Sequence, residues 1–477
     1  MKVAFLQNIW YDYMGVMSIA GYLKSKGHES CLFIEGGERD LIKAVRNYSP
    51  DLIGFPCLTG SHQWALSMAE RLKRDLSTPN IFGGIHATFF PEIIKYPQVD
   101  LVLRGEGEEA LGEVLERMET GKPLEGIKGL SFKRDGEFFL EEPAPLISDL
   151  NKLPSPDRDL YYRYKMLADN PTKHFMASRG CPFDCSFCYN SLEKKLYHTT
   201  KNLRFRKPEA VLDEIAYVKR KYPLKTVVFD DDILAVNVES LSELLDGYKR
   251  RIGLPFICNV RADLIDREIV KVLKQGGCFR VCMGVESGNE ELRYKVLNKK
   301  IKDQKIIESA RLLKEAGIKL LTNNIMGLPG ETLEDALKTV KLNIRIKVDY
   351  PWCSILQPYP GTEIADYAIE NGYVEKIDPD SFRPTFFESS LLKQKDIKEV
   401  VNLQKFFYLA VKIPVLLPLI KRLVRFNALS SVYNLIFLIT FSFRYMTSNR
   451  YSLIDMFFIS RDSLHLYLKK KLTCERN

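Results

Sequence analysis

Three cysteines stand close together in the segment 179–190, which reads RGCPFDCSFCYN. They are Cys181, Cys185 and Cys188, so their spacing is C-x3-C-x2-C. Iron–sulfur clusters are held by cysteine thiolates, normally four. A loop that supplies three thiolates, with no obvious fourth, indicates a cluster with one iron open to another ligand. A half zinc site or buried thiols are the alternatives, but zinc sites usually pair two ligand clusters and no H-x3-5-H set accompanies the cysteines.

The whole chain has the composition of an ordinary globular protein. Its 477 residues are enough for two or three domains. The remaining cysteines are scattered, which is typical of core packing in a reducing compartment, so we expect a cytoplasmic protein. The apolar run 1–6 is too short to be a secretory signal. The net charge is +9, and the excess of basic residues is clearest late in the chain.

Residues 1–145 alternate short apolar runs with amphipathic stretches, which is typical of βαβ units and a parallel sheet. The predicted strands are 2–6, 30–34, 52–55, 80–82 and 101–103, and the predicted helices are 17–26, 39–48, 63–75 and 108–120. This pattern predicts a doubly wound, flavodoxin-like or Rossmann-like sheet that binds ligands beyond the carboxyl ends of its strands. No G-x-G-x-x-G follows the first strand, which disfavours a dinucleotide site, and the glycines in these loops could be simple turn-formers.

A hairpin and a proline-rich segment follow the first predicted sheet. Asp135-Gly136 stands between two alternating runs, 130–133 and 137–140, and Asp-Gly in this position is a strong hairpin signal. The prolines from Pro143 to Pro156 interrupt regular structure, so we place a domain junction near residue 150. The expected domains are 1–145, 170–375 and 376–477, with a linker over 146–169.

The middle of the chain predicts six further βα units. The predicted strands are 174–177, 226–229, 256–260, 279–285, 319–325 and 352–357, and the predicted helices are 208–221, 238–250, 267–275, 303–315 and 332–346. Polar residues follow several of these strands. The triplet 230–232 is three aspartates, which could contact a ligand or cap a helix. Arg261 could pair with a carboxylate of a ligand or form a structural ion pair with Asp263 or Asp232.

These motifs resemble those of the radical S-adenosylmethionine (SAM) enzymes. In that family the three cysteines bind a 4Fe-4S cluster whose open iron chelates SAM, and reductive cleavage of SAM releases a 5′-deoxyadenosyl radical. The resemblance implies a partial (β/α)6 TIM-type barrel over 170–375, with its site at the carboxyl ends of the strands. The residues that it implies at the SAM site are Tyr189, Asp231, Arg261, Glu286, Ser287, Gly327 and Gln357. Gly327 lies in the segment GLPGET, which could also be only a tight turn and a helix cap.

The first domain resembles the cobalamin-binding domain that precedes the radical SAM core in class B enzymes. The resemblance rests on Thr59-Gly60, on 83–92 (GGIHATFFPE) and on 104–108 (RGEGE). It implies that the nucleotide tail of cobalamin contacts Thr59, Ser61, Gly83, Gly84 and Thr88. The D-x-H-x-x-G motif is absent and His86 stands in a different frame, so a base-off cobalamin without a histidine ligand is expected.

The overall appearance is nearest to the anaerobic magnesium-protoporphyrin monomethyl ester cyclase group and its methyltransferase relatives. The resemblance therefore predicts a cobalamin-dependent radical SAM enzyme, with methylation of an unactivated carbon in a small molecule or lipid as the leading function. A cyclase or oxidoreductase that transfers no methyl group is the alternative. A non-catalytic cobalamin carrier or membrane-surface protein is disfavoured because carriage needs no radical generator. A flavodoxin or ferredoxin is the expected reductant, and no nucleic-acid partner is expected.

Residues 376–477 read as a basic, apolar and helical domain. The stretch 426–443 carries no formal charge, but it is short and broken by polar residues for a membrane span, which needs about 20 apolar residues. A packed lid, a membrane-surface helix and a true span therefore stay open. Basic residues in this region fit either an anionic lipid surface or an ordinary solvated face. We expect the domain to shape substrate access, with possible peripheral membrane contact.

Overall fold

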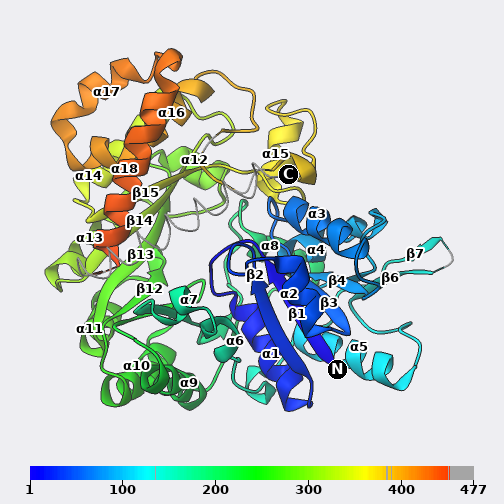
Figure 1. Cartoon of the computed structure of the whole chain (residues 1–477). Helices are drawn as coiled ribbons and strands as arrows, with labels where there is room; N and C mark the ends of the chain where they lie inside the picture. The colour runs from blue at the N-terminus through cyan, green and yellow to red at the C-terminus, as the bar shows by residue number, and fades with distance from the viewer. Residues whose placement is uncertain (135, 383–384, 388, 450, 452–477) are drawn as a thin grey trace.

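The computed structural model describes residues 1–134, 136–382, 385–387, 389–449 and 451. Figure 1 shows two α/β bodies side by side, the first in blue to cyan and the second in green to yellow, with the orange and red helices packed on the second. The first body contains a doubly wound sheet and the second a parallel partial barrel. The predicted fold class is therefore confirmed.

The first sheet has seven strands in the order β2-β1-β3-β4-β5-β6-β7. Its parallel strands are β1 (Lys2–Gln7), β2 (Glu29–Ile34), β3 (Leu52–Pro56), β4 (Asn80–Gly83) and β5 (Leu101–Leu103). The hairpin strands β6 (Leu130–Arg134) and β7 (Glu137–Phe139) extend the sheet in antiparallel pairing beyond β5. The order 2-1-3-4-5 of the parallel strands is flavodoxin-like, with the topological switch between β1 and β3.

Helices cover both faces of this sheet because successive strand residues point to opposite sides. Val3 and Phe5 of β1 pack with α1 (Met14–Ser25) and α5 (Gly107–Thr120). Ala4 and Leu6 pack on the other side with α2 (Leu41–Tyr48) and α3 (His62–Lys73). The segment after β4, which the sequence analysis treats as a loop, contains the short helices α4 (Ile85–Phe89) and η1 (Pro91–Lys95).

The proline-rich segment runs back over the first body before the barrel begins. It contains η2 (Leu150–Lys152), α6 (Asp159–Tyr162) and α7 (Lys165–Ala168), which the sequence analysis does not predict. The chain crosses α1 at Gly21, where an added Cβ would lie 2.3 Å from the Ser155 carbonyl oxygen. The backbone N–H of Asp157 donates a hydrogen bond to the carbonyl of Met17 at 2.8 Å. The segment is thus packed against α1 near residues 155–157 and at α6.

The second sheet has six parallel strands in the order β15-β14-β13-β12-β11-β8. They are β8 (Thr172–Phe175), β11 (Thr226–Phe229), β12 (Phe256–Val260), β13 (Cys278–Glu286), β14 (Lys319–Met326) and β15 (Tyr350–Ile355). The outer helices are α9 (Pro208–Lys221), α10 (Val238–Arg251), α11 (Arg267–Gly276), α13 (Asp303–Glu315) and α14 (Leu333–Arg345). Strand β8 ends two residues earlier than predicted because the Ala177 N–H donates to the Asp231 carboxylate and not to a strand.

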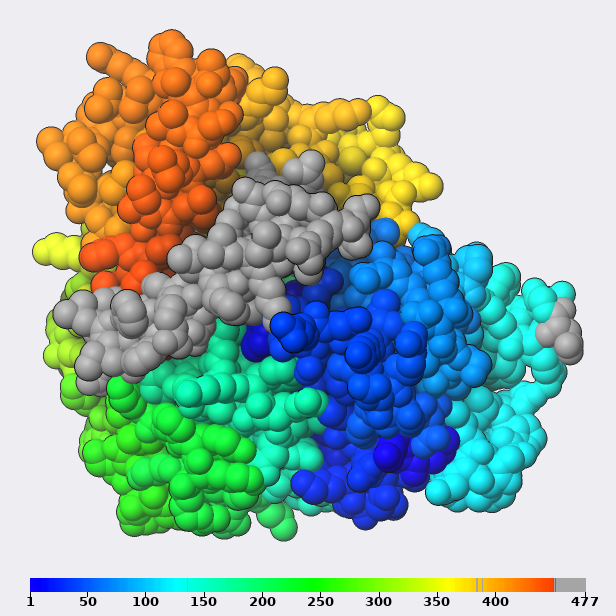
Figure 2. Space-filling model, in the orientation of Figure 1, coloured from blue at the N-terminus to red at the C-terminus, as the bar shows by residue number. Residues whose placement is uncertain are grey.

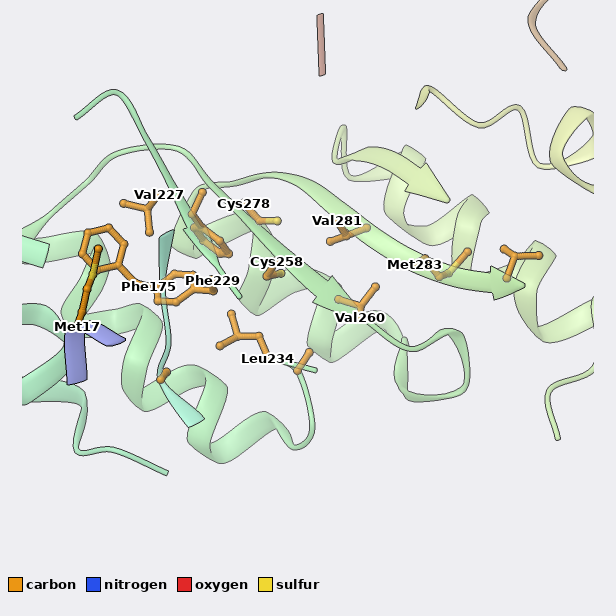
Figure 3. Close-up of a cluster of buried hydrophobic side chains, with 14 of the residues drawn as sticks. Met17, Phe175, Val227, Phe229, Leu234, Cys258, Val260, Cys278, Val281 and Met283 are labelled. Atoms are coloured by element: carbon orange, nitrogen blue, oxygen red, sulfur yellow. The ribbon is translucent and has the colours of Figure 1, made fainter. Parts of the chain in front are cut away.

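Alternate residues of the barrel strands build the core between sheet and helices. Figure 3 shows Phe175, Val227, Phe229, Cys258 and Val281 in one row of buried side chains along β8, β11, β12 and β13. The half-buried residues between them face the concave side, where a partial barrel holds its ligands. Shorter elements connect the strands: β9 (Ser178–Arg179), α8 (Tyr189–Leu196), β10 (Arg204–Phe205), η3 (Ala262–Leu264), α12 (Glu290–Lys295) and α15 (Glu363–Glu370).

The C-terminal helices close the β15 edge of the barrel. They are α16 (Ile397–Lys412), α17 (Leu417–Leu423) and α18 (Ser430–Ser448), with the short turns η4 (Pro379–Ser381), η5 (Pro414–Leu416) and η6 (Asn427–Leu429). Helix α16 packs on β15, α14 and α18. Residues 452–477 of the expected C-terminal domain lie outside the described residues. Within the described chain no single helix meets the length and hydropathy of a membrane span, but Pro414–Leu423 and Asn427–Ser448, bent by 110°, meet them together.

Candidate active site

A cavity of about 490 Å³ opens between the two bodies, at the carboxyl ends of the first sheet's parallel strands. Its first wall is formed by the segments after β1, β3, β4 and β5. Its second wall comes from the barrel and includes Met176, Ser178, Tyr189 and Asp230. Because Tyr189 directly follows Cys188, the cavity reaches the neighbourhood of the cysteine loop.

The first wall of the cavity is rich in glycines, which leave space where side chains would otherwise stand. The glycines that line it are Gly15, Gly54, Gly83, Gly84, Gly105 and Gly107. A Cβ added at Gly15 would meet nothing within 4 Å, and one added at Gly83 would find its nearest atom, the Leu103 carbonyl oxygen, at 3.8 Å. Larger side chains at these two positions would therefore occupy the cavity and not the protein core. The wall fits a large, flat ligand with a tail, as the resemblance to the cobalamin-binding domain implies.

Two of the five residues expected at the cobalamin tail line the cavity, namely Gly83 and Gly84. The other three make hydrogen bonds inside the loops. Ser61 Oγ donates to the Leu58 carbonyl at 3.0 Å. Thr88 Oγ1 donates to the Gly84 carbonyl at 2.9 Å and accepts from the Gly105 N–H at 3.0 Å. Thr59 Oγ1 lies 3.1 Å from His86 Nδ1.

His86 lies outside the cavity lining, in a stacked pair with His62. The two ring centroids are 3.8 Å apart. Burial, followed by the neighbouring His62, lowers the pKa of His86 to about 3, so its imidazole is neutral. His62 Nε2 contacts the Asp380 carboxylate at 2.9 Å. The pair thus ties the first body to the chain that leads into the C-terminal helices.

An ion-pair network, which we call the interdomain latch, joins the RGEGE segment to the start of the barrel. Arg179 Nη1 donates to Glu106 at 2.8 Å, and its Nη2 donates to Glu108 at 2.5 Å and to Ser18 at 3.0 Å. Arg204 Nη1 donates to the second oxygen of Glu106 at 2.7 Å. Sequence reasoning assigns no function to these arginines, although Arg179 stands two residues before the first cysteine. The latch holds the two walls of the cavity together.

Replacing Glu106 with glutamine is expected to lower the free energy of unfolding at pH 7 by about 3 kcal/mol, because it leaves the partly buried Arg204 without a carboxylate and takes one of two carboxylates from Arg179. Burial favours the neutral form of Glu106, but Arg204 and Arg179 outweigh it and hold its pKa below the ordinary value. The latch therefore stabilises the protein fully above that ordinary pKa and loses strength as the pH falls through the lowered one. Urea unfolding of the wild type and of Glu106→Gln at pH 7 and near pH 4 measures the difference in their free energies of unfolding. An equal difference at both pH values would contradict this role of the latch.

The cysteine loop is fixed by hydrogen bonds from the barrel. Ser186 N–H donates to the Leu297 carbonyl at 3.1 Å. Asn298 Nδ2 donates to the Asp184 carbonyl at 2.8 Å, and Lys194 Nζ to the Phe183 carbonyl at 3.0 Å. The backbone between the cysteines is thus held by the loop after α12 and by α8.

The donor chemistry of this loop fits an iron–sulfur cluster. Burial raises the pKa of Cys188 to about 12 and raises that of Cys181 as well. Such thiols become thiolates when a cationic metal centre compensates the charge. Across the described ranges, no three His, Cys, Asp or Glu side chains are arranged to hold a single metal ion.

Arg261, at the end of β12, lies directly beside the cysteine loop. Its Nη1 donates to Cys185 Sγ at 3.3 Å, and its guanidinium carbon lies 3.9 Å from the centre of the Phe183 ring. Its Nε donates to Asp263 at 2.8 Å. The structural ion pair with Asp263 is therefore present, and it orients the guanidinium toward the cysteine.

The three aspartates after β11 point in different directions. Asp231, the one singled out from the sequence, is buried and accepts hydrogen bonds from Ala177 N–H and Ser178 Oγ, and burial raises its pKa to about 6. Asp230 lines the cavity. Asp232 lies near the cysteines, where its charge adds to the effect of burial on the Cys181 and Cys188 thiols. Successive side chains of an extended chain point to opposite sides. This alternation could have predicted from the sequence that Asp231 points away from the side of Asp230 and Asp232.

Asp230 forms a polar trio with Tyr11 and His174, which the sequence analysis does not predict. Tyr11 OH donates to Asp230 Oδ2 at 3.0 Å, and His174 Nδ1 lies 2.8 Å from the same oxygen. Burial opposes protonation of His174, but Asp230 outweighs it, so the pKa of the imidazole is raised. Tyr11 comes from the loop after β1, so the trio bridges the two bodies at the cavity.

Glu286 ends β13 in a left-handed conformation, with φ of 65°. Such a backbone is costly for a residue with a side chain and is typical of functional sites. Lys299 Nζ donates to its carboxylate at 2.8 Å. A Cβ added at Gly284 would lie 2.2 Å from Glu286 Oε1, so a side chain there would displace this carboxylate. Ser287 is buried and its Oγ accepts from Asn289 N–H at 3.1 Å.

Gly327 and Gln357 follow β14 and β15. Gly327 has φ of +78° and its N–H donates to Glu331 Oε2 at 2.6 Å. Gln357 Nε2 donates to the Ser389 carbonyl at 3.2 Å. Arg261, Glu286, Gly327 and Gln357 thus all lie at the carboxyl edge of the barrel, although none of them lines the 490 Å³ cavity.

The stability of wild-type protein is expected to fall with rising pH relative to a Glu331→Gln variant. Burial raises the pKa of Glu331 to about 8. Between the ordinary pKa of a glutamate and pH 8, the unfolded chain releases this proton while the folded chain keeps it, which costs about 1.4 kcal/mol per pH unit. Urea midpoints of both proteins from pH 5 to 8 measure the difference. Parallel profiles would mean that Glu331 is ionised in the folded protein.

Cys278 and Cys282 also have a C-x3-C spacing, but they lie on opposite faces of β13. The register of β13 against β12 shifts between Phe256 and Ile257, which inverts the alternation after Cys278. Cys278 is buried in the main core, and Cys282 is half-buried on the concave face. They therefore form no second ligand pair.

The fold and the site together define a radical SAM enzyme with a cobalamin-binding domain. A family model described as "Radical SAM superfamily" matches residues 176–342, and one described as "B12 binding domain" matches residues 6–115. An uncharacterized methyltransferase of Pyrococcus horikoshii is 32% identical, over 70% of this chain and 72% of that protein. The chain belongs to the radical SAM superfamily, among the members with a B12 binding domain. Its cofactors are a 4Fe-4S cluster, SAM and cobalamin.

Two further similarities agree with this family. The anaerobic magnesium-protoporphyrin IX monomethyl ester cyclase of Rubrivivax gelatinosus is 26% identical, over 73% of this chain and 65% of that protein. The solved structure of the cobalamin-dependent S-adenosylmethionine radical enzyme OxsB with aqua-cobalamin and SAM has a TM-score of 0.69 and 17% identity. That likeness covers 98% of this chain and 75% of OxsB, and it concerns the fold.

Proposed function

We propose that this enzyme transfers a methyl group to an unactivated carbon of a small molecule or lipid. The observation that carries the proposal is that the 490 Å³ cavity is lined both by glycines of the first sheet and by residues next to the cysteine loop. A cobalamin-dependent methyl transfer to carbon needs both cofactor sites to face one substrate. The relative with 32% identity, which is named a methyltransferase, supports this reaction class.

The chain's own residues hold and orient the reacting groups. When bound, the cluster and SAM supply a 5′-deoxyadenosyl radical and cobalamin supplies the methyl group. Cys181, Cys185 and Cys188 are the proposed cluster ligands, and Arg261 beside Cys185 is suited to pair with the SAM carboxylate. The other proposed cofactor contacts are Thr59, Ser61, Gly83, Gly84 and Thr88 for cobalamin, and Tyr189, Glu286, Ser287, Gly327 and Gln357 for SAM. Asp231, which the resemblance implies at the SAM site, is not among these contacts because its buried carboxylate binds Ala177 N–H and Ser178 Oγ. Asp232 joins the SAM set because it lies beside the cysteines.

The trio of Tyr11, Asp230 and His174 is the proposed contact for a polar group of the substrate. The Tyr11 phenol and the Asp230 carboxylate line the cavity, and the His174 imidazole lies against that carboxylate. The rest of the cavity is lined mainly by apolar side chains and glycines. A substrate with an apolar body and one hydrogen-bonding group fits this distribution.

We also propose the domain limits 1–145, 170–375 and 376–477, with the linker 146–169, and a flavodoxin or ferredoxin as the reductant. The nine described cysteines form no disulfide with one another, which supports a reducing, cytoplasmic setting. The C-terminal helices are the proposed region of any peripheral membrane contact.

The product ratio tests the proposed reaction. Protein purified without oxygen, with reconstituted cluster and added cobalamin, is incubated with reductant, SAM and candidate substrates. A methyl transfer of this kind consumes two SAM molecules, so equal amounts of 5′-deoxyadenosine and S-adenosylhomocysteine are expected. Turnover of a substrate that gives deoxyadenosine without S-adenosylhomocysteine would overturn methyl transfer.

A cyclase or oxidoreductase without methyl transfer is the second candidate. The specific observation in its favour is the similarity to the Rubrivivax cyclase, which extends over 73% of this chain. Deoxyadenosine without S-adenosylhomocysteine, together with retained cobalamin, is the result that this alternative predicts.

A further inference from the structure

The outer side of the C-terminal helices exposes large apolar side chains that are not buried in a hydrophobic core. Val415, Phe426, Leu435, Leu438, Ile439 and Phe443 have exposed fractions between 58% and 81%. We call these six residues the C-terminal apolar surface. They lie on η5, on α18 and on the turn between α17 and α18. Figure 2 shows this region, in orange to red, on an outer corner of the molecule away from the first body.

Helix α18 has an ordinary inner face and an unusual outer face. On its inner face Phe441 contacts Trp352, with ring centroids 5.2 Å apart, and the Arg444 guanidinium lies 4.0 Å from the same ring. Arg444 is buried, and it is the one formally charged residue of α18. The outer face, with Leu435, Ile439 and Phe443 at helical spacing, therefore carries no charge. A helix on the water-exposed surface of a protein normally turns charged and polar residues outward.

The charged residues of the chain segment that carries this surface have one sign, although Lys421 forms an ion pair with Glu334 of α14. Residues 400–454 contain no Asp or Glu, whereas their basic residues are Lys405, Lys412, Lys421, Arg422, Arg425, Arg444 and Arg450. Arg422 and Arg425 are exposed at the end of α17, next to Phe426. Apolar side chains that insert, flanked by exposed arginines, are typical of segments that lie in the interface of an anionic membrane.

The bend between α17 and α18 favours insertion into one leaflet over crossing. Pro414–Leu423 and Asn427–Ser448 meet at 110°, and only together do they reach the length and hydropathy of a span. A second copy of the chain would fit the C-terminal apolar surface less well than a membrane. A symmetric contact pairs the same patch on both copies, which would bring the two sets of arginines together without a carboxylate from 400–454.

We propose that α17 and α18 dock the enzyme onto an anionic lipid surface, with the C-terminal apolar surface inserted among the lipids and Arg422 and Arg425 at the headgroups. This docking is independent of which reaction the active site performs. It requires no transmembrane segment and no partner protein.

Vesicle flotation of the full chain with cobalamin and reconstituted cluster tests the docking. Vesicles of phosphatidylcholine with 30% phosphatidylglycerol are compared with vesicles of phosphatidylcholine alone. The protein is expected to float with the anionic vesicles and to bind the neutral ones more weakly. No binding to the anionic vesicles, or equal binding to both, would overturn the proposal.

Two double variants and a control locate the contact. Leu435→Ser with Ile439→Ser is expected to weaken vesicle binding at least about tenfold through lost apolar burial. Arg422→Glu with Arg425→Glu is expected to weaken it about 25-fold or more, since each basic residue contributes about fivefold near such a surface. Leu140→Ser removes a side chain that is 49% exposed after the hairpin and should leave binding unchanged.

The variants also separate the lipid from a protein partner. Deoxyadenosine formation should be unchanged in both double variants, which shows that they are folded. Light scattering of the wild type and both variants reports the oligomeric state in solution. A wild type that is dimeric and does not float, with Leu435→Ser and Ile439→Ser giving monomers, would assign the surface to a second copy of the chain.

Discussion

Replacing Cys181 with alanine is expected to abolish formation of 5′-deoxyadenosine from SAM. The loop supplies three thiolates, so loss of one leaves two ligands for the cluster. The measurement is the rate of deoxyadenosine release under reducing, anaerobic conditions, together with the iron content and visible absorption of the reconstituted protein. Rates at the level of protein-free buffer are expected.

Cys31→Ala is the matched control, because Cys31 is a half-buried free thiol on β2, far along the chain from the loop. It should keep wild-type iron content and deoxyadenosine formation. Undiminished deoxyadenosine from Cys181→Ala would mean that the C-x3-C-x2-C loop does not generate the radical.

Replacing Gly83 with leucine is expected to weaken cobalamin binding at least about tenfold while the protein stays folded. A Cβ at Gly83 has room, since its nearest neighbour lies 3.8 Å away, and the rest of the leucine side chain extends into the cavity. Equilibrium dialysis with cobalamin measures the affinity, and thermal unfolding measures the fold. The cluster loop is untouched, so deoxyadenosine should still form without methyl transfer.

Gly83→Ala should bind cobalamin nearly as wild type does, because one methyl group fits beside Leu103. Gly15→Leu adds a side chain at another lining position, where nothing lies within 4 Å of an added Cβ, and should repeat the effect of Gly83→Leu. Unchanged cobalamin affinity in both leucine variants would place the cobalamin elsewhere.

Hydrophobic periodicity alone is enough to predict most of the two sheets. The runs at 2–6, 52–55 and 226–229 are bounded by polar or small residues, so their strands end within two residues of the predicted positions. The hairpin after β5 follows from Asp-Gly between alternating runs. The proline-rich segment is harder, because short helices such as α6 are stabilised by packing on α1 and not by their own pattern.

Side-chain direction limits what the sequence says about the site. Three aspartates in a row look equivalent, yet Asp231 binds the backbone at Ala177, just after β8, while Asp230 lines the cavity and Asp232 lies near the cysteines. The interdomain latch depends on Arg179 and Glu106, which are 73 residues apart, and no local pattern pairs them. The latch matters for function, because it sets the spacing between the glycine wall and the cysteine loop.

The most direct test of this account is the magnetic coupling between cobalamin and the iron–sulfur cluster. With cobalamin in its cob(II)alamin state and the cluster reduced, both are paramagnetic, and electron paramagnetic resonance reports the dipolar interaction between them. The shared cavity predicts a clear interaction, which should decrease in Gly83→Leu because this variant binds cobalamin more weakly. Two spectra that simply add, from a protein that holds both cofactors, would show that the sites do not face each other and would contradict the account.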